Sequence, residues 1–289
     1  MTIGVGFLCG DGAVLGTDTE ESYQDTKTSV NKITIVKRTY IHAGVAASGE
    51  SGLIDYIVPK VCRYLESEKG DNTTIEAGLQ SLMADVYDSK QVRSYPSDKP
   101  EDKTVSMIVI CRPKGHIAAM FQTCASLVTR VVTPALIGCG PLRDIADEFG
   151  RFSMTTDKAR WAALYLVLLA KERWNGVGGL SQVLQIWNDG SYALDRHWDQ
   201  ARRERLLLSI RSMHHLAVLN TTDLVQSDRE FTKNSSAILR HLREIRKELR
   251  GIDEQNMQQI FRTQLGIKTD KATIRHLAKQ AKYTGRLRS

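Results

Sequence analysis

The order of strand-like and helix-like segments constrains the fold of this 289-residue chain more than any other feature. Up to about residue 195, short segments rich in β-branched and small residues come in blocks, and two helical segments separate each block from the next. The order is strands, two helices, strands, two helices, strands. Segregated blocks of this kind are typical of α+β folds with antiparallel sheets, and they disfavour the alternating order of parallel βαβ folds.

Turn sequences and hydrophobic periodicity place the individual elements. Gly10-Asp11-Gly12 is a tight-turn sequence that joins the first two strand-like segments. Thr73-Thr74-Ile75-Glu76 has the pattern of a capping box at the start of a helix. Strands are expected at residues 3–9, 13–17, 32–36, 40–47, 105–111, 116–122, 127–132, 135–137, 184–187 and 192–194. Helices are expected at about residues 53–65, 73–90, 141–149 and 156–173, and residues 88–103 are expected to form a loop.

The last third of the chain differs in charge and in pattern. Residues 196–289 hold 20 of the 40 basic residues and only 10 of the 33 acidic ones. Helical periodicity recurs at residues 201–219, 236–250, 253–265 and 270–282, with an apolar stripe formed by Ile238, Leu242, Ile245 and Leu249. We therefore expect one domain over residues 1–195, followed by a basic, helical C-terminal extension over residues 196–289.

Two interpretations of this extension remain open. A basic helical face with few aromatic residues suits neutralisation of nucleic-acid phosphates. Alternatively, the helices pack on a neighbouring subunit through their apolar stripe while their charged faces stay in water. The stripe favours the structural interpretation, because apolar side chains at helical spacing need burial.

Several classes of protein do not fit the sequence. No run of eighteen apolar residues occurs, and the first residues lack the basic and apolar regions of a signal peptide. The five cysteines are scattered without a Cys-x-x-Cys pair, which suits reduced thiols in a cytoplasmic protein better than disulfides or a zinc site. Residues 176–179 are glycine-rich but lack the Lys-Ser or Lys-Thr of a phosphate-binding loop. We expect no metal, no cofactor and no membrane association.

Thr2, directly after the initiator methionine, brings a distinct chemistry. If Met1 is removed, Thr2 carries a nucleophilic hydroxyl and a free α-amine on one residue. Such an amine has an unperturbed pKa of about 7.7–8.0, so near neutral pH it can accept the proton of the hydroxyl. An amide nitrogen is no base, so this chemistry requires the removal of Met1.

Several short motifs occur in order over residues 2–195: Thr2-Ile3-Gly4-Val5-Gly6 leading into residues 12–18, Asn31-Lys32-Ile33, Ala43-Gly44-Val45, Gly138-Cys139-Gly140, Gly178-Gly179 and Asp189-Gly190. Together they resemble the motifs of proteasome β-type subunits and their simpler bacterial relatives, which are N-terminal-nucleophile hydrolases. This resemblance implies a four-layer αββα sandwich of antiparallel sheets with the active site at one edge.

The resemblance also implies the roles of six residues. Thr2 would be the nucleophile, Lys32 would stabilise negative charge beside it, and Asp18 would hold Lys32 by a charge-assisted hydrogen bond. The backbone N–H of Ala47 would form the oxyanion site. Cys139 would stand in the place of a serine near the α-amine, and Asn175 would be a polar group that orients the amine.

The sequence departs from this family where an aspartate and a serine usually orient the amine. Trp174 and Val177 occupy these two positions here, and Asn175 lies one residue from the first. The core of nucleophile, lysine and aspartate is therefore kept, while its supporting polar groups are not.

The sequence thus predicts a cytoplasmic threonine-type endopeptidase that hydrolyses peptides or unfolded proteins within a homo-oligomeric ring, without a cofactor. Because the chain has no phosphate-binding loop, any ATPase that supplies substrate would be a separate partner. One alternative is a non-catalytic scaffold subunit of the same fold. Another is a nucleic-acid-associated protein that acts through residues 196–289.

Overall fold

A computed structural model describes residues 2–23, 26–96, 103–138, 140–174, 176–195, 197–223 and 225–264. The chain divides into two compact units, Met1–Gln200 and Ala201–Ser289. Each unit is described by itself below. The domain division after residue 195 stays a prediction.

The first unit contains two five-stranded antiparallel sheets. The first sheet has the strand order β10-β1-β2-β11-β12 and the second sheet has the order β5-β6-β7-β8-β9. The strands of the first sheet are β1 (Gly4–Cys9), β2 (Gly12–Asp18), β10 (Ala135–Ile137), β11 (Ser181–Trp187) and β12 (Tyr192–Leu194). Those of the second are β5 (Ile33–Arg38), β6 (Ile41–Ser48), β7 (Ser106–Pro113), β8 (Ala119–Cys124) and β9 (Leu127–Arg130). A separate hairpin pairs β3 (Glu20–Tyr23) with β4 (Thr26–Ser29).

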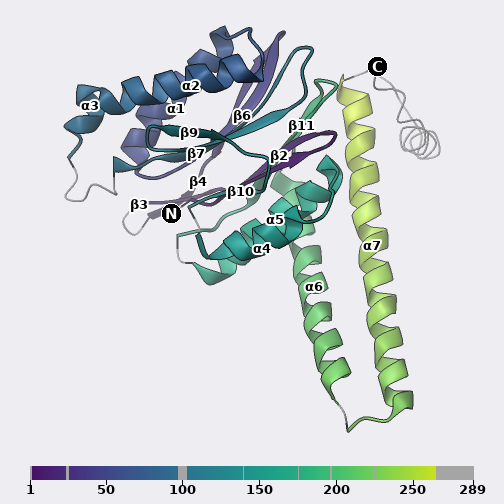
Figure 1. The fold of residues 1–289 in the computed structure, drawn as a ribbon. Coiled ribbons are helices and arrows are strands. Elements are labelled where there is room, and N and C mark those ends of the chain that lie inside the picture. The colour runs from purple at the N-terminus through teal and green to yellow at the C-terminus, as the bar shows by residue number, and fades with distance from the viewer. Residues whose placement is uncertain are drawn as a thin grey trace. The chain divides into compact units, whose positions relative to one another are not determined.

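Helices cover the two sheets (Figure 1). α1 (Ser51–Ser67) packs on β5 and β6, and α2 (Asn72–Asp88) packs on β9, so both lie against the second sheet. α5 (Thr156–Arg173) packs on β1, β2 and β11 of the first sheet, and α4 (Arg143–Gly150) lies against β10. The short helices α3 (Lys90–Arg93) and η2 (Gly140–Leu142) complete this set.

Alternation along the strands divides the buried side chains between separate cores. On β7, Ile108 and Ile110 belong to a core that also contains Leu15 of β2 and Leu184 of β11, so this core lies between the two sheets. Val109, between the two isoleucines, points to the opposite face and joins the core formed with α1 and α2. Successive side chains of a strand point to opposite faces, so one strand can contribute to both cores.

The central strand β2 is buried on both faces. All seven of its residues are buried, because one face meets the second sheet and the other meets α5. At Gly16 the helix comes so close that an added Cβ would lie 3.1 Å from the Cβ of Ala163. Ten of the eighteen α5 residues are buried, which explains why its sequence is apolar on most faces.

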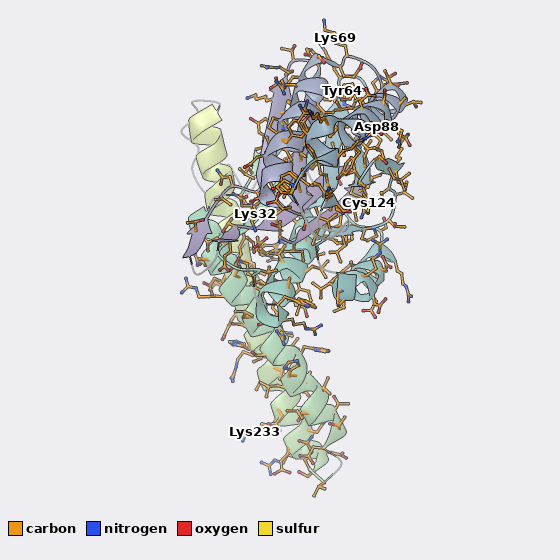
Figure 2. All side chains as sticks on the ribbon, turned by 90° about the vertical axis from the view of Figure 1, so that its left-hand side faces the viewer. Lys32, Tyr64, Lys69, Asp88, Cys124 and Lys233 are labelled. Carbon is orange, nitrogen blue, oxygen red and sulfur yellow. The ribbon has the colours of Figure 1, made fainter. Side chains whose placement is uncertain are left out.

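In the second unit, α6 (His197–Thr222) and α7 (Asp228–Gln264) form an antiparallel helix pair. Arg202 contacts Glu248 at 3.1 Å near one end, and Asn220 donates to Ser235 at 3.0 Å near the other. The apolar contact between the helices consists of Leu206, Ile210, Ile245, Leu249 and Ile252. Many charged residues stay in water, as Lys233 does in Figure 2.

The expected combination of helices with antiparallel sheets is confirmed. The predicted break between residues 250 and 253 is wrong, because α7 continues through Gly251; a single glycine costs a helix only about 1 kcal/mol and does not end it. The capping box at Thr73 is also wrong. Asp71 is the N-cap and accepts from the N–H of Thr74 at 2.8 Å. No sequence pattern indicated the β3–β4 hairpin, and the helix expected at residues 270–282 lies outside the described residues.

Within the described parts of the chain, no helix combines the length and the apolar character needed to cross a membrane.

The core between the sheets makes a testable contribution to stability. Ile110→Ala should lower the free energy of unfolding by about 2–5 kcal/mol, because Ile110 is fully buried between the sheets. Ile117→Ala is the matched control, since Ile117 is 64% exposed. Urea unfolding followed by circular dichroism measures both variants. Equal losses in the two variants would contradict the packing described here.

Candidate active site

A buried ion pair joins the end of β2 to the residue that precedes β5. The Lys32 ammonium lies 3.0 Å from Oδ2 and 3.1 Å from Oδ1 of Asp18, so it contacts both carboxylate oxygens. The Asp18 side chain is fully buried, and the Lys32 side chain is 9% exposed. The ammonium also donates to the backbone carbonyl of Glu20. Each charge is thus compensated in a place that water hardly reaches, which is the condition under which a buried pair is tolerated.

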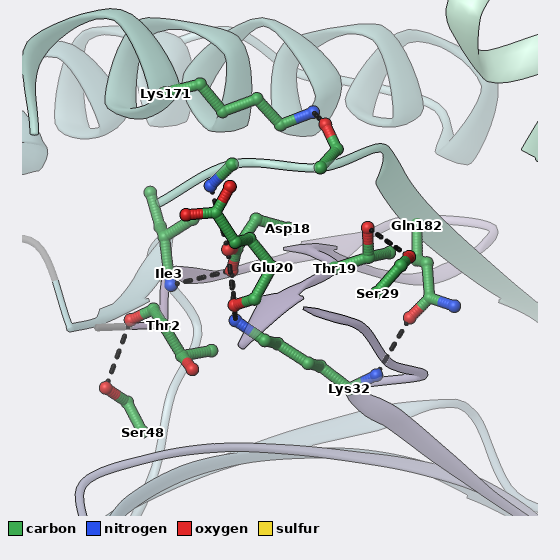
Figure 3. A network of polar contacts seen from close by, with 12 residues as sticks. Thr2, Ile3, Asp18, Thr19, Glu20, Ser29, Lys32, Ser48, Lys171 and Gln182 are labelled. Carbon is green, nitrogen blue, oxygen red and sulfur yellow. Dashed lines mark hydrogen bonds and ion pairs between the residues drawn. The ribbon is translucent and has the colours of Figure 1, made fainter. Parts of the chain in front are cut away.

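Two backbone N–H groups complete the surroundings of the Asp18 carboxylate (Figure 3). The N–H of Ile3 donates to Oδ1 at 3.2 Å, and the N–H of Gly178 donates to Oδ2 at 3.2 Å. An ionised carboxylate can accept about four hydrogen bonds, so Asp18 is close to saturated. This one side chain therefore connects the start of the chain, β2, the Gly178 turn and Lys32.

Thr2 lies beside this pair and is held through its backbone. Its carbonyl oxygen accepts a hydrogen bond from the Ser48 hydroxyl at 3.0 Å. In Figure 3, Thr2 lies between Ser48 and the Asp18–Lys32 pair. Gly138 has a φ of +77°, and a Cβ added to it would come within 1.6 Å of the Thr2 carbonyl oxygen. Only glycine fits at this position, so Gly138 allows the close approach that fixes Thr2.

The structure brings four of the six predicted site residues to one end of the sheets. Asp18 and Lys32 form the ion pair described above, and Thr2 directly precedes Ile3, whose N–H donates to Asp18. Ala47, which is buried, is the neighbour of Ser48 at the end of β6. Cys139 and Asn175 lie outside the described residues.

The backbone of Gly178 and of the segment before it is ordered by hydrogen bonds, and the Gly178 N–H donates to Asp18. Val177 is buried, and its N–H donates to the Trp174 carbonyl at 3.4 Å. The Gly178 carbonyl accepts from the N–H groups of Thr19 and Glu20 at 3.3 and 3.1 Å. Backbone groups make these contacts irrespective of the side chain, so Trp174 and Val177 are compatible with an ordered Asp18.

Sequence reasoning missed two polar side chains at this site, Ser48 and Gln182. Gln182 accepts from the backbone N–H of Lys32 at 3.0 Å, across 150 residues of chain. Adjacency to Ala47 could have pointed to Ser48. No local pattern could have found Gln182, because its partner, Lys32, lies 150 residues away in the segment that precedes β5.

The thiols of Cys111, which is buried, and of Cys9 and Cys62, which are partly buried, supply no competing nucleophile. Burial raises the pKa of Cys9 and of Cys111 to about 12 and that of Cys62 to about 11. These three thiols therefore stay protonated at neutral pH, and a protonated thiol is a poor nucleophile.

A hollow of about 420 Å³ opens at the end of the second sheet where Ser48 lies. It is lined in part by Cys124, Thr129, Arg130 and Arg143. Cys124 pairs with Ser106, which pairs with Ser48, so the hollow lies two strands away from the residue that holds Thr2. Its volume is within the range of ligand-binding clefts.

No family model and no curated protein sequence matches this chain. Solved structures of Anbu proteins are similar to it in fold. An Anbu (Gly-1) mutant from Hyphomicrobium sp. strain MC1 has a TM-score of 0.62 and 14% identity, covering 79% of this chain and 100% of its own. Anbu from Yersinia bercovieri, described as an ancestral beta-subunit, has a TM-score of 0.56 and 15% identity, with coverage of 73% and 97%. The Pseudomonas aeruginosa Anbu complex, solved as a helical assembly, has a TM-score of 0.57 and 14% identity, with coverage of 74% and 95%.

These comparisons correct the family named from the sequence. The structural similarity is to Anbu proteins, so the assignment to proteasome β-type subunits and their simpler bacterial relatives is wrong. Most of the glycines that carried the assignment are required by close packing, although Gly140 has open space around its Cα. At Gly44, for example, a Cβ would lie 2.2 Å from a Leu184 methyl group. Motifs that close packing imposes recur in families that share a fold, so they cannot separate such families.

The buried pair predicts a large cost for removing its cation. Lys32→Met leaves the Asp18 carboxylate buried with two backbone donors and no counter-charge, so the free energy of unfolding should fall by about 3–5 kcal/mol. Lys114→Met, at an exposed lysine, is the control and should change it by less than about 0.5 kcal/mol. Chemical denaturation measures both. A Lys32→Met variant as stable as the control would show that the pair is not buried as described.

Proposed function

We propose that the chain is a threonine-type endopeptidase that acts through Thr2 after removal of Met1. The observation that carries this proposal is the buried Asp18–Lys32 pair beside Thr2. The carboxylate holds the ammonium from one side. On its other side, the ammonium can stabilise negative charge that develops on a reacting group. The backbone contacts of Thr2 with Ser48 and Gly138 hold the nucleophile in place, which is the positional contribution that catalysis requires.

The reaction follows from the groups on Thr2 and around it. The α-amine of Thr2 takes the hydroxyl proton while Oγ1 attacks the peptide carbonyl and forms a tetrahedral oxyanion. The Lys32 ammonium and the N–H of Ala47 stabilise the negative charge. The protonated amine then gives its proton to the leaving nitrogen as the C–N bond breaks, leaving an ester on Oγ1. Water, deprotonated by the same amine, hydrolyses this ester and restores the hydroxyl.

The two sheets and their helices support the N-terminal-nucleophile architecture proposed with this mechanism. α1 and α2 pack on one sheet, α5 packs on the other, and an apolar core lies between the sheets. We propose a four-layer αββα sandwich, with residues 1–195 as the peptidase domain and residues 196–289 as the basic helical extension. The proposal also includes Cys139 and Asn175 as residues near the α-amine of Thr2.

We also propose that the protein works as a homo-oligomer that encloses its sites and acts on peptides or unfolded proteins. The Pseudomonas aeruginosa Anbu complex, similar in fold, forms a helical assembly, which supports self-association of this fold. A separate ATPase partner belongs to the same proposal, and nucleic-acid contact through residues 196–289 stays an alternative to it. The described part of that extension is a two-helix pair with basic side chains such as Arg240 and Lys247 exposed.

A non-catalytic scaffold subunit is the second candidate. Trp174 and Val177 favour it, because neither supplies the carboxylate or hydroxyl expected beside the α-amine. The mass of the purified protein separates the two functions: retained Met1 blocks the amine and supports the scaffold, whereas its loss exposes the amine.

Peptide hydrolysis tests the role of Thr2. Thr2→Ala should lower kcat/KM for a fluorogenic peptide by about 10³-fold or more, because it removes the attacking oxygen. Thr2→Ser is the matched control and should stay within about tenfold of wild type, since it keeps both the hydroxyl and the amine. Thermal unfolding of both variants should match wild type. Hydrolysis by Thr2→Ala at the wild-type rate would exclude Thr2 as the nucleophile.

A further inference from the structure

Gln182 occupies a position on β11 where an apolar residue would be expected. Gln182, Leu184 and Ile186 alternate along the strand and therefore share one face. Leu184 and Ile186 lie in the apolar core between the sheets, while Gln182 is 2% exposed at the end of the strand nearest Lys32. A buried amide is retained only where its polar atoms find partners.

Both ends of the Gln182 amide have such partners. Its Oε1 accepts from the backbone N–H of Lys32 at 3.0 Å, and its Nε2 donates to Oδ1 of Asn31 at 2.6 Å. The two contacts fix the amide in one orientation, because a flipped amide would bring its NH₂ group against the Lys32 N–H. Gln182 therefore holds two consecutive residues of the segment that precedes β5, Asn31 and Lys32. Figure 3 shows its contact with Lys32.

Lys32 is consequently anchored to the first sheet through both its backbone nitrogen and its ammonium, although it leads into the second sheet. Gln182 on β11 holds its backbone nitrogen, and Asp18 on β2 holds its ammonium. β11 and β2 are paired neighbours, with Ser181 opposite Asp18. Paired strands keep a fixed separation of about 4.8 Å. The two anchors therefore fix the positions of both the backbone nitrogen and the ammonium of Lys32.

We propose that Gln182 is a positioning residue for the peptidase reaction, which holds Lys32 at the depth where its ammonium reaches both Asp18 and the reacting oxygen. This inference rests on the proposed function. A lysine side chain has several rotatable bonds, so Asp18 alone leaves the backbone of residue 32 free to shift. A misplacement of about 1 Å at a catalytic group can cost about 10²-fold in rate.

Gln185 provides a matched control on the same strand. It is also 2% exposed, but it lies on the opposite face of β11 from Gln182, and its Nε2 has no hydrogen-bond partner among the described residues. Replacing either glutamine by methionine removes an amide from a buried site at similar volume. Only the change at residue 182 removes the acceptor of the Lys32 N–H.

The experiment compares Gln182→Met, Gln185→Met and wild type in the full chain. For Gln182→Met we expect kcat for a fluorogenic peptide to fall about 10- to 100-fold while KM stays within about twofold, because the substrate contacts are untouched. Gln185→Met should keep kcat within about twofold of wild type. Hydrogen–deuterium exchange resolved at the Lys32 amide should accelerate about tenfold or more in Gln182→Met and remain unchanged in Gln185→Met.

The outcomes separate this inference from the proposed function. An active wild type whose kcat is unchanged by Gln182→Met would overturn the role of Gln182 and leave Thr2 as the nucleophile. Unchanged exchange of the Lys32 amide in Gln182→Met would also overturn it, even if the rate falls. A wild type that hydrolyses no peptide would overturn the proposed function, and the positioning role with it.

Discussion

The buried ion pair between Asp18 and Lys32 is the interaction on which the candidate site depends. Asp18 ends β2 of the first sheet, and Lys32 directly precedes β5 of the second sheet. Separating two charges in a place that water hardly reaches would leave each without compensation, so the pair fixes the relative position of the sheets at this end. The N–H groups of Ile3 and Gly178 satisfy the remaining capacity of the carboxylate. The start of the chain is thereby drawn to the same point as the lysine.

The rest of the first unit supports this point by close packing. β2 is buried on both faces, which leaves its final residue, Asp18, inside the protein rather than at the surface. Gly138 admits the Thr2 carbonyl because it has no Cβ, and Ser48 at the end of β6 binds the same oxygen. These contacts join three distant segments around Thr2. A nucleophile held in this way is ordered before substrate arrives, which lowers the entropic cost of the reaction.

Local patterns predicted most of the helices and strands, and contacts between residues far apart in the sequence could not be predicted in this way. Thr2 was proposed from its own chemistry, whereas Asp18 and Lys32 were proposed through the family resemblance, and the structure joins these two in an ion pair. Gln182 could not be chosen, because its role depends on its hydrogen bond with Lys32, which is 150 residues away in the sequence. The polar segment from Glu20 to Ser29 hid the β3–β4 hairpin, and the glycine at position 251 suggested a helix break that packing overrides. The family name was wrong because motifs imposed by packing do not distinguish families that share a fold.

The most direct test of the account is to locate the residue that an electrophilic peptide modifies. The protein is incubated with a peptide that carries a carbonyl electrophile, and tandem mass spectrometry then identifies the modified residue. We expect a single adduct on Thr2 in chains that have lost Met1, and no adduct in Lys32→Ala. An adduct on another residue, or a modified chain that still carries Met1, would contradict it.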